Sequence, residues 1–426
     1  MVENVAMRPK RLLVVEEVLK GQVGHWYEYV RAVVELNRAE GVDAIAVVHA
    51  AVEPEIAREI GAIPAFARSN WDNVYGRANA LQSLIGVVRH NWLVYRTMRR
   101  IVRERGPIDC LFAPTVWLHH IWGWRLLMAL HGSKIGRMVL LFRMNPGTSV
   151  PGSDVPVFDR SMTLLKWGMQ SFAGAIARGK VVFATDSTRL ARQYQMLCGI
   201  SPELFPSPRI APFDDRKKPE KQPGEPIVFS SLGPARFDKG IDLIQAAIKL
   251  CLAAGTSRPV KFVIQWNQPI RDGAGQPYLP DAALENDPRV EFIRQSLDSA
   301  DYDAAIQAAD CMLLPYRRDS YYARISGVAV EAATAGIPMI HTGDTWIGDL
   351  VDSVGAGVAV DDGDVGQLAA AIHAVIDNFE AFRTRAGERQ PLAVAVHSSE
   401  AFQNCLWGRE RQYCLSGEER PGGSEQ

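Results

Sequence analysis

The sequence predicts an α/β protein made of two tandem Rossmann-like domains that face a cleft. Three observations predict this class. The chain has 426 residues, more than one typical hydrophobic core contains. Apolar strand-like runs alternate with helical patterns, as in a doubly wound, mostly parallel sheet. A polar, proline-rich stretch, "PFDDRKKPEKQPGEP", then separates one such alternation from a second one.

The first alternation forms the predicted N-terminal domain, residues 1–212. It opens with the strand-like run "RLLVVEE", a glycine-containing turn "LKGQVGH" and an amphipathic helix "WYEYVRAVVELNRAEG". Later strand-like runs are "DAIAVVHA", "IDCLF", "RMVLLF" and "VVFATD". Ligands of such sheets bind at the carboxyl ends of the strands, so the turns after these runs are where binding is expected.

The second alternation, residues 227–395, follows a linker predicted at 213–226. Its strand-like runs are "IVFSSLG", "VKFVIQW", "VEFI" and "CMLLPY". Apolar residues recur at helical spacing between Lys239 and Ala254, which predicts a helix there. We expect residues 396–415 to form a C-terminal helix that packs back on the first domain, and residues 416–426 to form a disordered tail.

Composition narrows the functional classes. The formal net charge is −1 and the pI about 6.8, so no global basic field favours nucleic acid as a partner. The six cysteines are scattered without a CxxC pair, which is typical of buried thiols in a reducing compartment. The N-terminal apolar run is too short for a signal peptide. These features predict a cytoplasmic protein.

One apolar segment raises the question of a membrane. "CLFAPTVWLHHIWGWRLLMAL" contains His119, His120 and Arg125, and is therefore a poor bilayer-spanning segment. Its "HHIWGW" part could touch a membrane interface, although buried aromatic core is the simpler interpretation. Peripheral contact with the inner face of the membrane stays an open expectation.

Several motifs imitate known sites. "GAIARGKV" lacks the Ser or Thr of a P-loop and runs into a strand, and "GAGVAV" lacks the third glycine of a dinucleotide fingerprint. "DDGD" precedes a helical pattern, so helix capping by Asp362 or Asp364 is the better interpretation. His119 and His120 have no companion ligands at metal spacing. The sequence therefore predicts no metal site.

The segment "ISGVAVEAATAGIPMI" places one charged residue, Glu331, in a small and apolar run. The run lacks proline between Ser326 and Gly336, which predicts a short buried helix that ends at the glycine. Glutamate is almost never fully buried unless something pairs with it. The partner of Glu331 is therefore a guide to function.

Two features of the second domain predict an anion site. "SLGPARFDKG" sets Arg236 and Lys239 beside glycines at a strand–helix turn, although solvated surface cations remain an alternative. A polar loop rich in Arg and Tyr then delivers Ser326 and Gly327 to the start of the Glu331 helix, where backbone N–H groups favour phosphate. The Glu331 carboxylate, about a turn further in, suits the vicinal hydroxyls of a ribose. Together they describe a nucleotide diphosphate.

The order and spacing of these pieces also match a known family. Residues 226–341 resemble the nucleotide-sugar-binding domain of the retaining GT-B glycosyltransferases of the glycosyltransferase 4 type (group 1). The resemblance implies that Lys239, with Arg236, neutralises a sugar diphosphate and that Glu331 holds the ribose. The remaining donor-side residues that we assign are Gly233, Ile293 and Arg294 (flanking the base), Tyr316, Arg324, and Ser326, Gly327 and Val328 (backbone donors to phosphate).

The chain departs from the family pattern at three places. Ala323 stands where the first of two motif glutamates belongs, so its sugar contact is missing or supplied differently, for instance by Arg324. Pro234 occupies the position of the usual arginine, and "VLLFRMNPG" lacks the family's histidine. His25 and His120 are candidate catalytic residues of the first-domain cleft, while a structural role is the simpler expectation for each.

The sequence thus predicts a glycosyltransferase that moves a sugar, with retention, from a nucleotide-diphosphate sugar to an acceptor. The acceptor would be a glycan, a lipid-linked glycan or a small molecule. No cofactor is expected besides the donor substrate. Two alternatives remain: a GT-B protein that binds a nucleotide sugar without transferring it, and a nucleotide-sugar epimerase of the same architecture.

Overall fold

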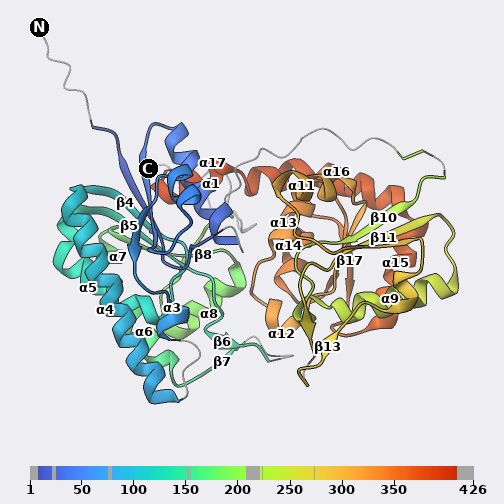
Figure 1. Cartoon of the computed structure of the whole chain (residues 1–426), viewed down its shortest axis with the longest axis horizontal. Helices are drawn as coiled ribbons and strands as arrows, with labels where there is room; N and C mark the ends of the chain where they lie inside the picture. The colour runs from blue at the N-terminus through green and yellow to red at the C-terminus, as the bar shows by residue number, and fades with distance from the viewer. Residues whose placement is uncertain are drawn as a thin grey trace, which may run out of the picture. The chain divides into compact units, whose positions relative to one another are not determined.

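The computed structural model describes residues 8–21, 25–74, 79–150, 153, 155–207, 221–222, 224–272 and 274–409. Contacts divide the chain into two compact units, one of Met1–Ala211 with Ser398–Gln426 and one of Pro212–His397 (Figure 1). Most of the predicted linker and the whole predicted tail lie outside the described residues. Within the described part of the chain, no helix combines the length and apolar character needed to cross a bilayer.

The first unit is built on a parallel seven-stranded sheet of order β3-β2-β1-β4-β5-β8-β9. Its strands are almost entirely apolar and buried, as strands covered on both faces must be. Their bounds are β1 Arg11–Glu16, β2 Asp43–His49, β3 Ile63–Phe66, β4 Ile108–Ala113, β5 Ile135–Phe142, β8 Val181–Thr185 and β9 Glu203–Leu204. A separate hairpin pairs β6 (Gly147–Thr148) with β7 (Val157–Phe158).

Helices cover this sheet and connect its strands (Figure 1). Their bounds are α1 His25–Ala39, α2 Pro54–Glu59, α3 Asn70–Asn73, α4 Ala80–Arg105, α5 Leu118–His131, α6 Met162–Gln170, α7 Ala173–Ala177 and α8 Thr188–Cys198. The last helix among the described residues, α17 (Ser399–Trp407), also belongs to this unit. Its Phe402 ring packs edge-on against Tyr29 and Phe112, so the end of the chain completes the core of the first unit.

The second unit has a parallel six-stranded sheet of order β14-β11-β10-β15-β16-β17. The strands are β10 Ile227–Ser231, β11 Val260–Gln265, β14 Val290–Ile293, β15 Cys311–Leu314, β16 Met339–Thr342 and β17 Gly357–Val360, with β12 Ile270–Arg271 and β13 Pro277–Tyr278 in a hairpin. The helices are α9 Ile241–Ala254, α10 Ala282–Glu285, α11 Ser299–Ala308, α12 Arg318–Tyr321, α13 Gly327–Thr334, α14 Trp346–Val354, α15 Val365–Asp377 and α16 Phe379–Val396.

Two local expectations are resolved here. The helix predicted from Lys239 begins instead at Ile241, because Gly240 before it has a φ of 70°, outside the helical range. A Cβ at Gly240 would lie 2.2 Å from the carbonyl oxygen of Pro315, so only glycine fits there. Phe237–Lys239 form one 3₁₀ turn before it. The capping role of the "DDGD" stretch is confirmed for Asp364, whose side chain accepts a hydrogen bond from the Gln367 N–H at 2.8 Å.

Candidate functional site

The loop after β10 forms one wall of the candidate donor site. Gly233 has a φ of 83°, and its N–H donates to the side-chain oxygen of Gln265, at the end of β11, over 2.6 Å. A Cβ at Gly233 would lie only 2.8 Å from the Lys239 Nζ and 3.6 Å from Val328. Gly233, Lys239 and the start of α13 therefore meet at one point, the carboxyl edge of the sheet, where ligands of such sheets bind.

Lys239 carries the charge at this point. Its Nζ lies 5.6 Å from the centre of the Tyr316 ring, and Tyr316 is buried just after β15. Burial and the neighbouring Arg236 lower the pKa of Lys239 to about 8. The residue as a whole is half-buried, but its ammonium packs against Gly233 and the tyrosine ring. A cation crowded by another cation at the edge of a sheet favours a bound anion.

Two arginines surround the Tyr321 ring close to Lys239. The Arg236 guanidinium donates to the Tyr321 hydroxyl at 2.9 Å and forms an ion pair with Asp238, also at 2.9 Å. Arg324 is exposed and lies over the same ring at 5.3 Å. Ala323 is fully buried, so the position of the missing motif glutamate faces the interior, whereas the next residue offers a cation to solvent.

The N-terminus of α13 has the features of an anion-binding site. Ser326 is buried and caps the helix by accepting a hydrogen bond from the Ala329 N–H at 3.3 Å. Gly327 is exposed, and a Cβ added to it would meet no atom within 4 Å. A ligand can therefore approach the backbone N–H groups of the first turn, where the helix dipole favours negative charge.

Glu331 lies one turn further along α13 and is half-buried. Its carboxylate accepts a hydrogen bond from the Tyr302 hydroxyl of α11 at 2.8 Å. Arg324, the partner that proximity in sequence suggests, stacks on Tyr321 instead. A tyrosine hydroxyl is a neutral donor, so this hydrogen bond orients the carboxylate and leaves its charge in place.

Ile293 and Arg294, the pair predicted to flank the base, lie at and just after the end of β14. Ile293 ends β14 and is half-buried. Arg294 is exposed, forms an ion pair with Glu285 and lies over the Phe292 ring at 5.4 Å. These contacts of Arg294 are thus with β14 and α10.

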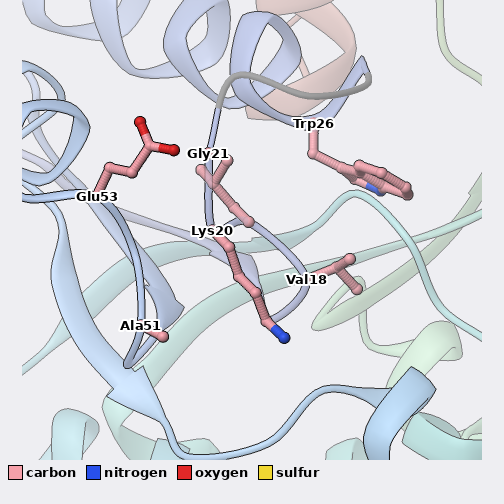
Figure 2. Close-up of a pocket in the computed structure, with 7 residues that line it drawn as sticks. Val18, Lys20, Gly21, Trp26, Ala51 and Glu53 are labelled. Atoms are coloured by element: carbon pink, nitrogen blue, oxygen red, sulfur yellow. The ribbon is translucent and has the colours of Figure 1, made fainter.

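The first unit contains a pocket of about 300 Å³ at the carboxyl ends of β1 and β2. Figure 2 shows Lys20, Trp26 and Glu53 around it, together with Val18, Gly21 and Ala51. The Lys20 ammonium lies 3.7 Å from the Asp72 carboxylate. An aromatic ring beside ammonium and carboxylate groups suits a polyhydroxylated ligand, whose hydroxyls need both donors and acceptors.

The two histidines predicted for the first domain have different outcomes. His25 is the first residue of α1, but its side chain lies outside the described residues. His120 is buried, and its Nε2 lies 3.3 Å from the carboxylate of Glu17. Sequence spacing did not reveal this partner, because Glu17 is far from His120 along the chain. Gln265 and Tyr302, which position Gly233 and Glu331, were also missed.

Replacing Gly233 by alanine tests whether activity depends on the position of the Lys239 ammonium beside Gly233. The new Cβ would displace the ammonium that now lies 2.8 Å away, so we expect donor turnover to fall about tenfold or more. Gly255→Ala is the matched control, since Gly255 has a similar φ of 79° and its Cβ would meet nothing within 4 Å. Equal activities of the two purified variants would contradict the assigned contact.

Comparisons with known proteins agree with this geometry. Residues 227–378 match the family described as Glycosyl transferases group 1. No curated protein matches the chain by sequence. Sucrose-phosphate synthase from Thermosynechococcus elongatus is similar in structure, with a TM-score of 0.60 at 15% identity over 94% of this chain and 98% of that one.

Two other solved structures show the same fold. HepE from Anabaena, in complex with UDP and glucose, has a TM-score of 0.59 at 13% identity, over 93% of this chain and 98% of that one. The lipopolysaccharide outer core galactosyltransferase WaaB, in its apo form, has a TM-score of 0.60 at 14% identity, over 94% of this chain and all (100%) of that one. Residues 227–378 thus match the group 1 glycosyltransferase family, and the chain as a whole has the GT-B fold of these structures.

Proposed function

We propose that this enzyme transfers a sugar from a nucleotide-diphosphate sugar to a glycan or lipid-linked acceptor, with retention at the anomeric carbon. The observation that carries the proposal is the meeting of Lys239, Gly233 and the open N-terminus of α13 at one edge of the second sheet. The HepE structures hold UDP or UDP-glucose, which supports a nucleotide sugar as the donor.

The chemistry follows from charge. When the glycosidic bond to the donor breaks, the leaving diphosphate gains negative charge. Lys239, Arg236 and the N–H groups at the start of α13 are fixed before the reaction and would stabilise that charge in the transition state. Glu331, held by Tyr302, would accept hydrogen bonds from the ribose hydroxyls. The side chains of this site supply the positive charge themselves, so no cofactor is part of the proposal.

The acceptor would bind the first unit, in the pocket that Figure 2 shows. Trp26 could cover the apolar face of a sugar ring while Lys20 and Glu53 bind its hydroxyls. Cys110, Cys198, Cys251 and Cys311 are free and buried, which supports a reducing compartment such as the cytoplasm.

One surface of the first unit supports contact with a membrane. Leu81, Val88 and Trp92 are exposed on α4 and recur at helical spacing on one face, with Leu84 and Ile85 beside them. The same helix carries six arginines and one glutamate. An apolar stripe followed by basic residues is typical of helices that lie in the interface of an anionic bilayer. A lipid-linked acceptor would then be presented at this membrane.

Binding to vesicles tests that contact. We expect a Val88→Ser/Trp92→Ser variant to bind vesicles of phosphatidylglycerol and phosphatidylcholine about tenfold more weakly in a sedimentation assay, because two inserted apolar side chains are lost. Both residues are exposed, so the melting temperature should stay unchanged. Leu250→Ser, which changes a similarly exposed leucine on α9, is the control. Equal binding by the double variant and wild type would argue against docking through α4.

The proposed activity is tested by incubating the protein with labelled nucleotide-diphosphate sugars and following nucleotide release with and without acceptors. Acceptor-dependent release with a glycosylated product supports transfer, and the anomeric configuration of that product decides retention. Binding without release indicates a nucleotide-sugar-binding protein. Conversion of one nucleotide sugar into its epimer indicates an isomerase.

A further inference from the structure

Four buried side chains of the first unit converge beneath the turn that follows β1. Glu17 comes directly after that strand, His90 lies in the middle of α4, and His119 and His120 lie in the first turn of α5. Each of the four is at most 4% exposed. One ligand atom from each of Glu17, His119 and His120 lies within 4.8 Å of the others. Helices α4 and α5 lie side by side along this unit, which brings the histidines together (Figure 1).

His90 lies beside this group. The His90 Nε2 lies 3.4 Å from the Glu17 Oε1, and the His120 Nε2 lies 3.3 Å from the same oxygen. The rings of His119 and His120 are 4.3 Å apart between centroids, and His90 lies 5.5 Å from His119. Two ligands at about 2.05 Å from a tetrahedral zinc ion are separated by about 3.3 Å. The observed nitrogen–oxygen distances therefore match the edge of a tetrahedral site.

Glu17 is the acceptor around which the group is arranged. Its Oε1 accepts from the Asn70 N–H at 3.1 Å, and the Nε2 atoms of His90 and His120 face the same oxygen. A divalent cation at this position would bind the carboxylate and the imidazole nitrogens together.

The donor types suit zinc as well. Imidazole nitrogens and a carboxylate oxygen are among the ligands that zinc takes in proteins.

We propose that Glu17, His119 and His120 form a site for a divalent first-row metal ion, most suitably Zn²⁺, with His90 beside it. All three ligands are buried, which indicates an ion that stabilises the fold rather than one that contacts substrate. The ion would fasten the end of β1 to α5. Val18, the next residue after Glu17, lines the pocket of Figure 2, so the ion would also stabilise part of the lining of that pocket.

The test uses untagged full-length protein and measures metal directly. After dialysis against buffer with trace Zn²⁺, we expect about one zinc per chain by elemental mass spectrometry. Replacing zinc by Co²⁺ should give the visible absorption bands of tetrahedral cobalt. Stripping the ion with a chelator should lower the melting temperature, and Zn²⁺ should restore it, because a ligand that binds only the folded state stabilises it. None of these measurements depends on a donor or an acceptor, so they are independent of the proposed activity.

Variants locate the ion. His119→Gln and His120→Gln should each reduce the zinc content to near zero, whereas His131→Gln, at the far end of the same helix, should keep it. Circular dichroism checks that each variant folds. Wild-type protein without metal at saturating Zn²⁺ would overturn the proposal whatever the variants do. Undiminished zinc in a folded His119→Gln variant would also overturn it, since the ion would then lie elsewhere.

Discussion

Lys239→Ala is expected to lower turnover of the nucleotide-diphosphate sugar about 10- to 100-fold, because a charge-assisted hydrogen bond to phosphate is worth roughly 1.5–3 kcal/mol. The fold should tolerate the change. The pKa of Lys239 in the folded protein, about 8, lies below its usual value of 10.5, so burying the charged ammonium costs stability at pH 7. Initial rates at several donor concentrations, beside a thermal melt, measure both effects.

A lysine-to-alanine substitution elsewhere in the second unit serves as the control for this variant. Lys249→Ala removes an exposed lysine of α9 that pairs with Asp281 at 2.6 Å, and such surface pairs contribute little. The pH profile gives a second check. Lys239 is charged below pH 8, so kcat/KM of the wild type should fall as pH rises through about 8, and this limb should vanish in Lys239→Ala. Unchanged nucleotide binding by the alanine variant would remove Lys239 from the site.

Much of the fold could be predicted because its strands are buried on both faces and therefore appear as continuous apolar runs. The predicted runs "RMVLLF" and "CMLLPY" correspond to β5 and β15. The two-residue strand β9 was not anticipated, since so few residues carry no periodicity. The start of α9 was misplaced by two residues because Gly240 adopts a left-handed backbone conformation, which apolar spacing does not reveal.

The candidate donor site was predictable where function depends on a local motif. The cap by Ser326 and the open approach at Gly327 follow from one short segment, and the structure contains both. The orienting residues were not predictable in this way. Tyr302 reaches Glu331 from another helix, and Glu17 meets His90 and His120 only after three elements have packed. Sequence spacing can reveal ligands that lie in the same helix or loop. The residues of this cluster come from three separate segments of the chain, so their spacing does not reveal them.

Glu331→Gln is expected to weaken binding of a ribonucleotide diphosphate about 10- to 100-fold, since glutamine keeps the shape but loses the charge and one acceptor for the ribose hydroxyls. The amide oxygen can still accept from the Tyr302 hydroxyl, so the melting temperature should change little. The 2′-deoxy nucleotide already lacks one hydroxyl and should lose less affinity. Calorimetric titration of both nucleotides into wild type and variant measures the difference.

Two further variants separate a ribose contact from a structural role of Glu331. Glu291→Gln removes an exposed carboxylate of β14 that pairs with Lys261, and should leave both affinities unchanged. Tyr302→Phe keeps the Glu331 carboxylate but deletes its observed donor. If Glu331 acted mainly through buried pairing, its loss would cost about 3–5 kcal/mol and the melting temperature would drop visibly. Equal losses for ribo- and deoxyribonucleotides, together with such a drop, would exclude the ribose contact, because a hydroxyl-specific acceptor must discriminate between the two sugars.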